Sequence, residues 1–171
     1  RAKLRSLANP IEAILQVGKN GLGDALQKQV DEADAEIGLR YQGGDVTETI
    51  TIEKDVIIDM GGATITSIAG SPAFNIDNGA HVTLRNATII ADSVAYADDA
   101  ELRGAFLGKA PSAIRVLNGH LKLEQCTVYG SKTTVDGQEL YTGSAVELMD
   151  GSTLTVRKSE LHGVYAVNNA V

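Results

Sequence analysis

An internal repeat constrains the fold of this chain more than any other feature of its sequence. Three segments align, and each alternates apolar with polar residues before it reaches an Asn-Gly or Asp-Gly pair. These segments are residues 73–79, 113–119 and 145–151. Asn-Gly and Asp-Gly pairs adopt positive φ angles readily. Each segment therefore predicts a short strand that ends in a tight turn.

The residues after each turn also match from copy to copy. Three positions are apolar in all three copies and a fourth always carries a small side chain. The apolar sets are Val82, Leu121 and Leu154, then Leu84, Leu123 and Val156, then Ile89, Val128 and Leu161, and the small set is Ala87, Cys126 and Ser159. A fourth copy begins at Ala166-Val167 and the sequence ends within it, so we expect the repeat to be truncated there.

The spacing between copies varies because two of them carry extra residues. The alanines that open successive copies are 40, 32 and 21 residues apart. The excess falls in residues 92–111 and 132–143, which are predicted to be insertions at one corner of a constant unit. Strands of successive units can then stack about 4.8 Å apart. This arrangement predicts that Phe74, Ile114 and Val146 lie directly above one another.

Matched columns of this kind predict a parallel β-helix over residues 43–171. A β-sandwich is the main alternative, because it also has short alternating strands with turns between them. A sandwich does not require columns in register, so the repeat favours the β-helix. The sequence is 43% hydrophobic but only 4% aromatic, with no Trp, which predicts a core of Val, Ile, Leu and Ala.

Residues 1–42 are predicted to be a helical N-terminal segment. Asn9 can cap a helix that begins at Pro10 and is broken by residues 18–21. A second helix is predicted over residues 22–37, because apolar residues recur there at spacings of three and four. They are Leu22, Leu26, Val30, Ala33 and Ile37. This stripe can cover the open end of the β-domain or pack against the same helix of neighbouring subunits, and both alternatives remain open.

Charge and cysteine content exclude several kinds of partner. The net charge is -7, and a nucleic acid or an anionic membrane would need clustered Lys and Arg. No apolar run is long enough for a transmembrane helix, so no membrane insertion is predicted. Cys126 is the single cysteine, which rules out a disulfide within the chain.

The repeat, together with the run over residues 50–65, resembles the pectin-lyase-like superfamily of right-handed parallel β-helices. The resemblance extends from about residue 45 to residue 171. The superfamily includes polysaccharide lyases and hydrolases, phage tailspikes and tail proteins, and autotransporter adhesins. The resemblance implies a right-handed coil, and a helical segment before it is similar to several phage tail and virion proteins. It specifies an architecture that many functions share.

The catalytic patterns that this resemblance implies are missing from the sequence. Lyases of the superfamily use clustered Asp with calcium and an Arg base, and its galacturonidases combine Asp-rich motifs with a Gly-His-Gly. The nearest strings are Asp98-Asp99 and Asn118-Gly119-His120, which lack their companions. We therefore predict no catalytic residue, no cofactor and no metal site.

The two insertions hold the candidate ligand-binding residues. Because both leave the same corner of consecutive units, they are expected to be neighbours. The candidates are Tyr96, Asp98, Asp99 and Phe106 in the first insertion and Asp136 and Tyr141 in the second. The aromatic rings can stack on a sugar or contact a protein, and two carboxylates at the right separation can hydrolyse a glycosidic bond. The simpler interpretation is solvated loop charges and aromatic rings packed on the β-helix wall.

Outward-facing positions form columns of their own. The two charged columns are Arg85, Glu124 and Arg157, and Asn75, Arg115 and Glu147. Ion pairing between neighbouring strands explains them without chemistry. His81 and His120 share a column, so their rings can stack, and Thr153 takes the place of a third ligand. Cys126 is predicted to be a small inward side chain.

The leading hypothesis is a structural or adhesive component of a phage virion or tail, similar to a tailspike or fibre. Residues 1–42 would bind other virion proteins, the subunits would form a homotrimer, and a surface glycan is a possible ligand. One alternative is a bacterial cell-surface adhesin or autotransporter passenger, at the cell surface or secreted. Another is a polysaccharide lyase or hydrolase whose active site lies outside these residues or between subunits.

Overall fold

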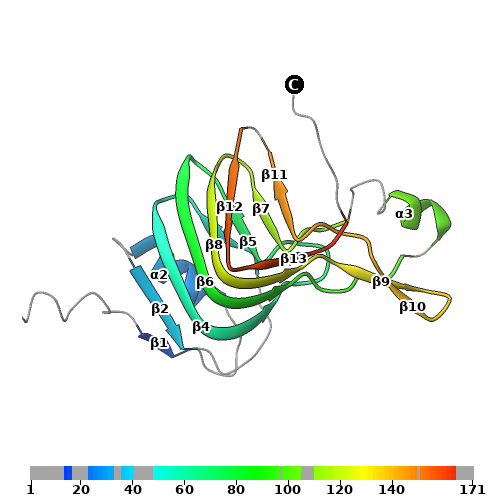
Figure 1. Ribbon diagram of the computed structural model, residues 1–171, viewed down its shortest axis with the longest axis horizontal. Coiled ribbons are helices and arrows are strands. Elements are labelled where there is room, and N and C mark those ends of the chain that lie inside the picture. Colours follow the sequence, from blue (N-terminus) through cyan, green and yellow to red (C-terminus); the bar gives the residue numbers. More distant parts are fainter. Residues whose placement is uncertain are drawn as a thin grey trace, which may run out of the picture.

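The computed structural model describes residues 14–16, 23–32, 36–40, 48–96, 98–104, 110–149 and 151–164. Most of these residues form β-strands, and two short helices accompany them (Figure 1). The strands are β1 (Ile14–Gln16), β2 (Glu36–Arg40), β3 (Ile50–Ile52), β4 (Val56–Thr66), β5 (Phe74–Ile76), β6 (Ala80–Ile90), β7 (Ile114–Val116), β8 (Gly119–Tyr129), β9 (Lys132–Val135), β10 (Gln138–Tyr141), β11 (Val146–Leu148), β12 (Thr153–Arg157) and β13 (Glu160–His162). The helices are α2 (Asp24–Glu32) and α3 (Asp99–Gly104).

The chain alternates between two parallel sheets. The four-stranded sheet has the order β11-β7-β5-β3, and the seven-stranded sheet has the order β1-β2-β4-β6-β8-β12, with β13 also paired to β8. Each short strand of the first sheet is followed by a strand of the second, which has 11 residues in β4, β6 and β8 and 5 residues in β12. We call each such pair of strands a layer. The prediction of an all-β fold with parallel strands is confirmed.

Successive layers are in the register that the repeat predicts. Phe74 pairs with Ile114, and Ile114 pairs with Val146. In the other sheet Val82, Leu121 and Leu154 form one ladder, and Ile89, Val128 and Leu161 form another. Phe74 and Ile114 are fully buried, and Val146 packs against the same core from the last layer. The geometric prediction on which the repeat analysis depends is confirmed.

The long strands bend where one residue leaves the β region. The φ angles are 56 degrees at Asn86, 54 degrees at Gln125 and 50 degrees at Lys158. In β6 and β8 this residue follows the paired Arg85 and Glu124, so it occupies the same corner of each layer. In β4 the corner contains Gly61 and Gly62, and the register shifts there. Figure 1 shows the resulting curvature of β4, β6 and β8.

The predicted tight turns are confirmed in part. Asn78 and Gly79 have φ angles of 58 and 73 degrees, and Gly151 has 75 degrees. Gly119 is not in the left-handed region, although it also follows an asparagine. A Cβ at Gly119 would lie 3.0 Å from the carbonyl oxygen of Ala80, so this glycine permits close stacking rather than an unusual turn.

Helix α2 covers one end of the stacked layers. Leu26 and Val30 are buried in the core, which supports the first of the two alternatives for the apolar stripe. The side chain of Gln27 makes two hydrogen bonds of 2.8 Å with the backbone of Thr51, one from Nε2 to the carbonyl oxygen and one from the Thr51 N–H to Oε1. The amide group thus occupies the edge of β3 as a neighbouring strand would. Lys54 also donates to the carbonyl oxygen of Asp31.

The predicted helices are corrected in two places. Ile14–Gln16, within the first predicted helix, is strand β1, and the rest of that helix lies outside the described residues. Helix α2, Asp24–Glu32, lies within the second predicted helix, but Ile37 lies in β2, where it pairs with Ile58. The open edge of β4 offers main-chain hydrogen bonds to β2, and β2 offers them to β1, so sheet pairing replaces the helix that local spacing favours.

Candidate functional site

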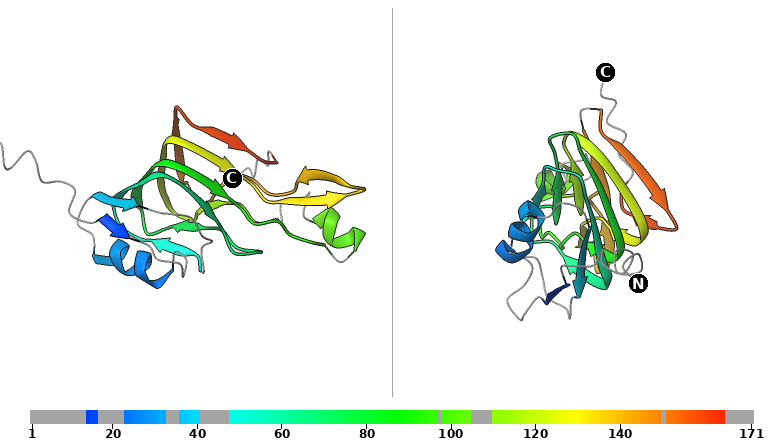
Figure 2. Two further views of the ribbon diagram at one scale, coloured as in Figure 1. Left: turned by 90° about the horizontal axis from the view of Figure 1, so that it is seen from below. Right: turned by 90° about the vertical axis from the view of Figure 1, so that its left-hand side faces the viewer.

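The two insertions lie side by side on the same side of the layers. The backbone N–H of Val94, in the first insertion, donates a 3.1 Å hydrogen bond to the carbonyl oxygen of Lys132, at the start of the second. The second insertion forms the antiparallel hairpin β9–β10. Figure 2 shows this hairpin and α3 projecting together beyond the stacked strands. The prediction that the insertions are neighbours is confirmed.

Close glycine contacts fix the base of the hairpin against the layers. A Cβ at Gly130 would lie 2.0 Å from the carbonyl oxygen of Gly143, and a Cβ at Gly143 would lie 2.1 Å from that of Pro111. Neither contact leaves room for a side chain. The backbone of the hairpin base is therefore held directly on the neighbouring layer.

A pocket of about 490 Å³ opens between the insertions. Its walls come from the segment before and within α3 and from the hairpin, and they combine hydroxyl, charged and apolar side chains. The lining residues are Ser93, Val94, Ala95, Tyr96, Asp98, Leu102, Lys132, Thr133, Thr134, Val135 and Glu139. A pocket of this size accommodates a small polar molecule or one to two sugar rings.

Asp98 lines the pocket, but its carboxylate caps a helix. Its Oδ1 accepts hydrogen bonds of 2.8 Å from the backbone N–H groups of Ala100 and Glu101. This is the N-cap arrangement, in which an acidic side chain satisfies the first N–H groups of α3. The residue therefore stabilises the wall of the pocket by capping α3.

Glu139 and Lys132 form an ion pair on the hairpin. Lys132 Nζ lies 3.1 Å from Glu139 Oε2 and 5.1 Å from the centre of the Tyr141 ring. The hydrogen bond from Lys132 to Glu139 raises the pKa of the lysine. Glu139 is paired with Lys132 and Asp98 caps a helix, so both pocket carboxylates act as hydrogen-bond acceptors. The geometry suits recognition of hydroxyl groups more than acid–base catalysis.

The remaining predicted site residues are spread over the two insertions. Tyr96 is half-buried, and its hydroxyl lies 3.4 Å from Thr142 Oγ1. Tyr141 is half-buried below Lys132. Asp136 lies at the hairpin turn, exposed, with a φ angle of 51 degrees, and is not part of the pocket lining. Asp99 begins α3 with a side chain outside the described residues, and Phe106 lies outside them altogether.

The sequence reasoning did not identify Lys132 or the hairpin. Asp136-Gly137 lies between two alternating runs, which is the usual signal for a two-residue hairpin turn. That signal would have placed β9 beside β10 and Lys132 across from Tyr141, as the register shows.

The outward columns are confirmed in register, with ion pairs between layers in both, whereas the buried Asn75 Oδ1 has no hydrogen-bond partner in the described part of the chain. Arg115 Nε lies 2.7 Å from Glu147 Oε2, and Arg157 Nη1 lies 3.9 Å from Glu124 Oε1. The His81 and His120 rings stack with centroids 4.2 Å apart. His120 Nδ1 also lies 2.7 Å from Thr153 Oγ1. Within the described part of the chain, no three His, Cys, Asp or Glu side chains cluster as metal ligands would.

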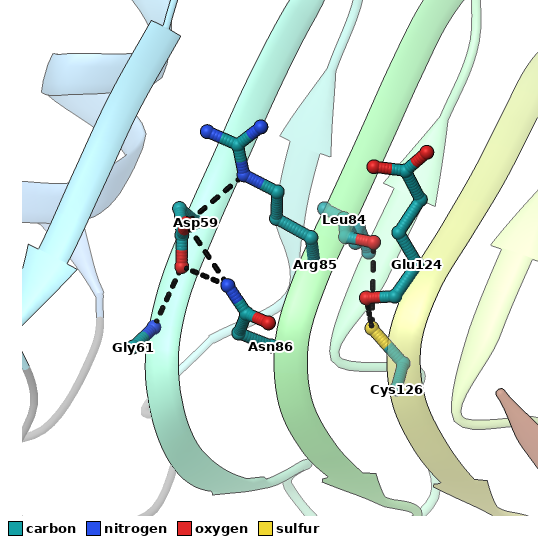
Figure 3. A network of polar contacts seen from close by, with 7 residues as sticks. All are labelled: Asp59, Gly61, Leu84, Arg85, Asn86, Glu124 and Cys126. Carbon is teal, nitrogen blue, oxygen red and sulfur yellow. Dashed lines mark hydrogen bonds and ion pairs between the residues drawn. The ribbon is translucent and has the colours of Figure 1, made fainter. Parts of the chain in front are cut away.

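A polar network surrounds the bend of the long strands (Figure 3). Asp59 accepts hydrogen bonds from Arg85 Nε at 2.9 Å, from Asn86 Nδ2 and from the backbone N–H of Gly61. In the next layer the Cys126 thiol lies 3.3 Å from the carbonyl oxygen of Leu84. Burial raises the pKa of Cys126, so the thiol stays neutral and the prediction of a small inward side chain is confirmed.

None of the helices in the described residues is both long enough and apolar enough to span a membrane. No family model, curated protein or solved structure matches the chain.

Proposed function

We propose that this chain is part of a right-handed parallel β-helix that serves as a rigid structural or adhesive element of a phage virion or tail. The in-register stacking of Phe74, Ile114 and Val146 carries the proposal. Each layer satisfies the backbone of the layer before it, so further layers lengthen the rod without widening its core. A rod of this kind transmits position and force along its axis.

The outward-facing side chains favour the interpretation of a structural rod over that of a catalytic surface. The charged residues at the wall pair between layers, as Arg85 does with Asp59 and Arg115 with Glu147. Such cross-strand pairs favour one register over others. These ion pairs hold neighbouring layers together.

Attachment to other virion proteins is proposed to use residues 1–42. Within this segment Leu26 and Val30 of α2 are buried on the first layer. The exposed side of α2 includes Asp24, Lys28 and Glu32. The partner would therefore bind the polar side of a helix whose apolar side is already covered.

The subunits are proposed to associate laterally as a homotrimer. Light scattering on the full-length protein is expected to give three times the subunit mass, or a multiple of that value. A stable monomer at micromolar concentration would contradict the proposal. Immunogold labelling of purified particles with an antibody to this chain then distinguishes a virion component from a cell-surface protein.

Saccharide binding in the insertion pocket is a second candidate function. The pocket between the hairpin and α3 favours it, because hydroxyl and carboxylate groups line it beside apolar side chains. Incubation with capsular or pectic polysaccharides tests both binding and cleavage. If the pocket is used, Glu139→Gln weakens retention of the glycan, whereas Asp136→Asn, at the hairpin turn outside the lining, does not. Reducing-end release that E139Q abolishes would identify an enzyme, and equal retention by both variants would exclude the pocket.

A further inference from the structure

The pocket between the insertions is lined by more acidic than basic side chains. Its charged lining residues are Asp98, Glu139 and Lys132, two acidic and one basic, which gives a formal charge of -1. The whole chain has a formal net charge of -7 at pH 7. Local and overall charge therefore have the same sign, and both attract cations and repel anions.

The basic residue of the lining is already paired. Lys132 Nζ donates a hydrogen bond of 3.1 Å to Glu139 Oε2. An acidic ligand would have to compete with Glu139 for this ammonium group, and it would approach two carboxylates at the same time. Like charges that are brought together in a binding site cost affinity. The lining is therefore unfavourable for uronic acids and other anionic sugars.

The two carboxylates each keep one oxygen outside the contacts that hold the pocket wall. Asp98 caps α3 through Oδ1, and Glu139 is bonded to Lys132 through Oε2. Asp98 Oδ2 and Glu139 Oε1 take part in none of these contacts. Both residues are exposed, so a ligand can reach them. An ammonium group bonded to a carboxylate forms a hydrogen bond about twice as strong as one between neutral groups.

The uncharged part of the lining suits a sugar ring. Ser93 and Thr134 are exposed and supply hydroxyl groups, while Val94, Leu102 and Val135 are half-buried and supply apolar surface. Ligand sites commonly combine apolar walls with a few polar groups that fix the orientation of the ligand. The apolar side chains can contact the C–H groups of a sugar, and the hydroxyl groups can bond to its edge.

We propose that this pocket selects saccharides that carry a free amino group, such as oligomers of glucosamine, over neutral and acidic saccharides. The inference rests on the saccharide binding proposed above and names the class of sugar. The ammonium group of the ligand binds the carboxylate of Asp98, because that of Glu139 is already bonded to Lys132. An N-acetyl group in its place removes the charge, and a carboxylate reverses it.

Three soluble oligosaccharides of equal length test this preference: an oligomer of glucosamine, its N-acetylated form and an oligomer of galacturonic acid. Calorimetric titration of the whole chain at about pH 6 keeps a free amine protonated. The glucosamine oligomer is expected to bind at least about tenfold more tightly than its N-acetylated form, and the galacturonic acid oligomer most weakly. Equal affinities for the first two, or tightest binding of the third, would overturn the inference.

Failure of the inference is distinguishable from failure of the saccharide proposal. If the neutral or acidic oligomer binds best and Glu139→Gln weakens that binding, the pocket binds saccharides but does not select amino sugars. If none of the three oligomers binds, both the saccharide proposal and the inference fail.

Asp98→Asn separates a specific contact from general attraction between a cationic oligomer and an acidic protein. Asparagine caps helices as well as aspartate, so α3 keeps its cap. Asp136→Asn makes the same change in net charge at the hairpin turn, outside the lining. D98N is expected to lower the affinity for the glucosamine oligomer about tenfold, and D136N less than about twofold. Unchanged amide resonances of Ala100 and Glu101 verify the cap, and equal losses in both variants would contradict a contact with Asp98.

Exchange of both carboxylates tests the sign of the charge. In the double variant D98N/E139Q, Lys132 is the remaining charged residue of the lining and has lost its partner. The formal charge of the lining changes from negative to positive, so the galacturonic acid oligomer is expected to bind more tightly than the glucosamine oligomer. A double variant that still prefers the glucosamine oligomer would overturn the inference.

Discussion

At the scale of single residues, the inward and outward columns contribute differently to the fold. The inward side chains exclude water, which supplies most of the stabilisation. The outward charges contribute only about 0 to 1 kcal/mol per exposed pair. Glu124 illustrates their role, because Lys122 lowers its pKa and Arg157 lies 3.9 Å away. Pairs of this kind disfavour a shifted register, since a slip by one residue would bring each charge to the core.

The left-handed corner residues are a source of strain that substitution can relieve. Gln125 has a φ angle of 54 degrees, which glycine adopts without steric cost. Gln125→Gly is expected to raise the free energy of unfolding by about 0.5 to 1 kcal/mol. Urea denaturation measures the change. Thr127→Gly, two residues later in the regular part of β8, should lower it by about 1 kcal/mol, and a loss of stability in Q125G would contradict the corner assignment.

Cys126 makes the free energy of unfolding depend on pH in the alkaline range. Burial raises the pKa of its thiol in the folded protein. The stabilising contribution is therefore fully present below the thiol pKa of the unfolded chain and is lost as the pH rises towards the folded pKa. We expect Cys126→Ala to lose less stability than the wild type between about pH 8 and about pH 10. Parallel urea titrations across this range measure it, and identical pH profiles would show that the thiol is not desolvated.

At the scale of elements, helix α2 forms a cap on the first layer. It shows that a side chain can take up the hydrogen bonds of the backbone at the edge of a sheet. The sequence indicated an apolar stripe with Leu26 and Val30, and these residues are buried as a stripe predicts. It did not indicate that Gln27 would bond to Thr51, because that contact depends on where the helix meets the strand. Strand β2 was predicted as helix for the same reason, since pairing partners are distant in sequence.

The contacts of this cap predict that substitution of the partly exposed Gln27 has a large effect on the free energy of unfolding. Gln27→Ala leaves the N–H and C=O groups of Thr51 without their partner, so we expect a loss of about 1 to 3 kcal/mol in the free energy of unfolding. Faster hydrogen exchange at the Thr51 amide should accompany it. Lys28→Ala is the matched control, because Lys28 is exposed and forms only a 3.8 Å pair with Glu32. Equal effects of the two substitutions would contradict the role of the cap.

At the scale of the whole molecule, the repeat predicted the stacking of layers because identical positions must be buried in every layer. Columns such as Val82, Leu121 and Leu154 have no local cause, so their recurrence reports the three-dimensional register directly. The insertions were located by the same repeat, as interruptions of a constant unit. Their internal structure was not predicted, because the contacts of Lys132 and Asp98 have no counterpart in the other layers.

Nuclear Overhauser effects on methyl-labelled protein test the stacked register most directly. Phe74 pairs with Ile50 on one side and with Ile114 on the other. The ring protons of Phe74 are therefore expected to show strong effects to the methyl groups of both isoleucines. Strong effects from Phe74 to residues two positions away from this register, with none to Ile114, would contradict the stacked layers and the rod that we propose from them.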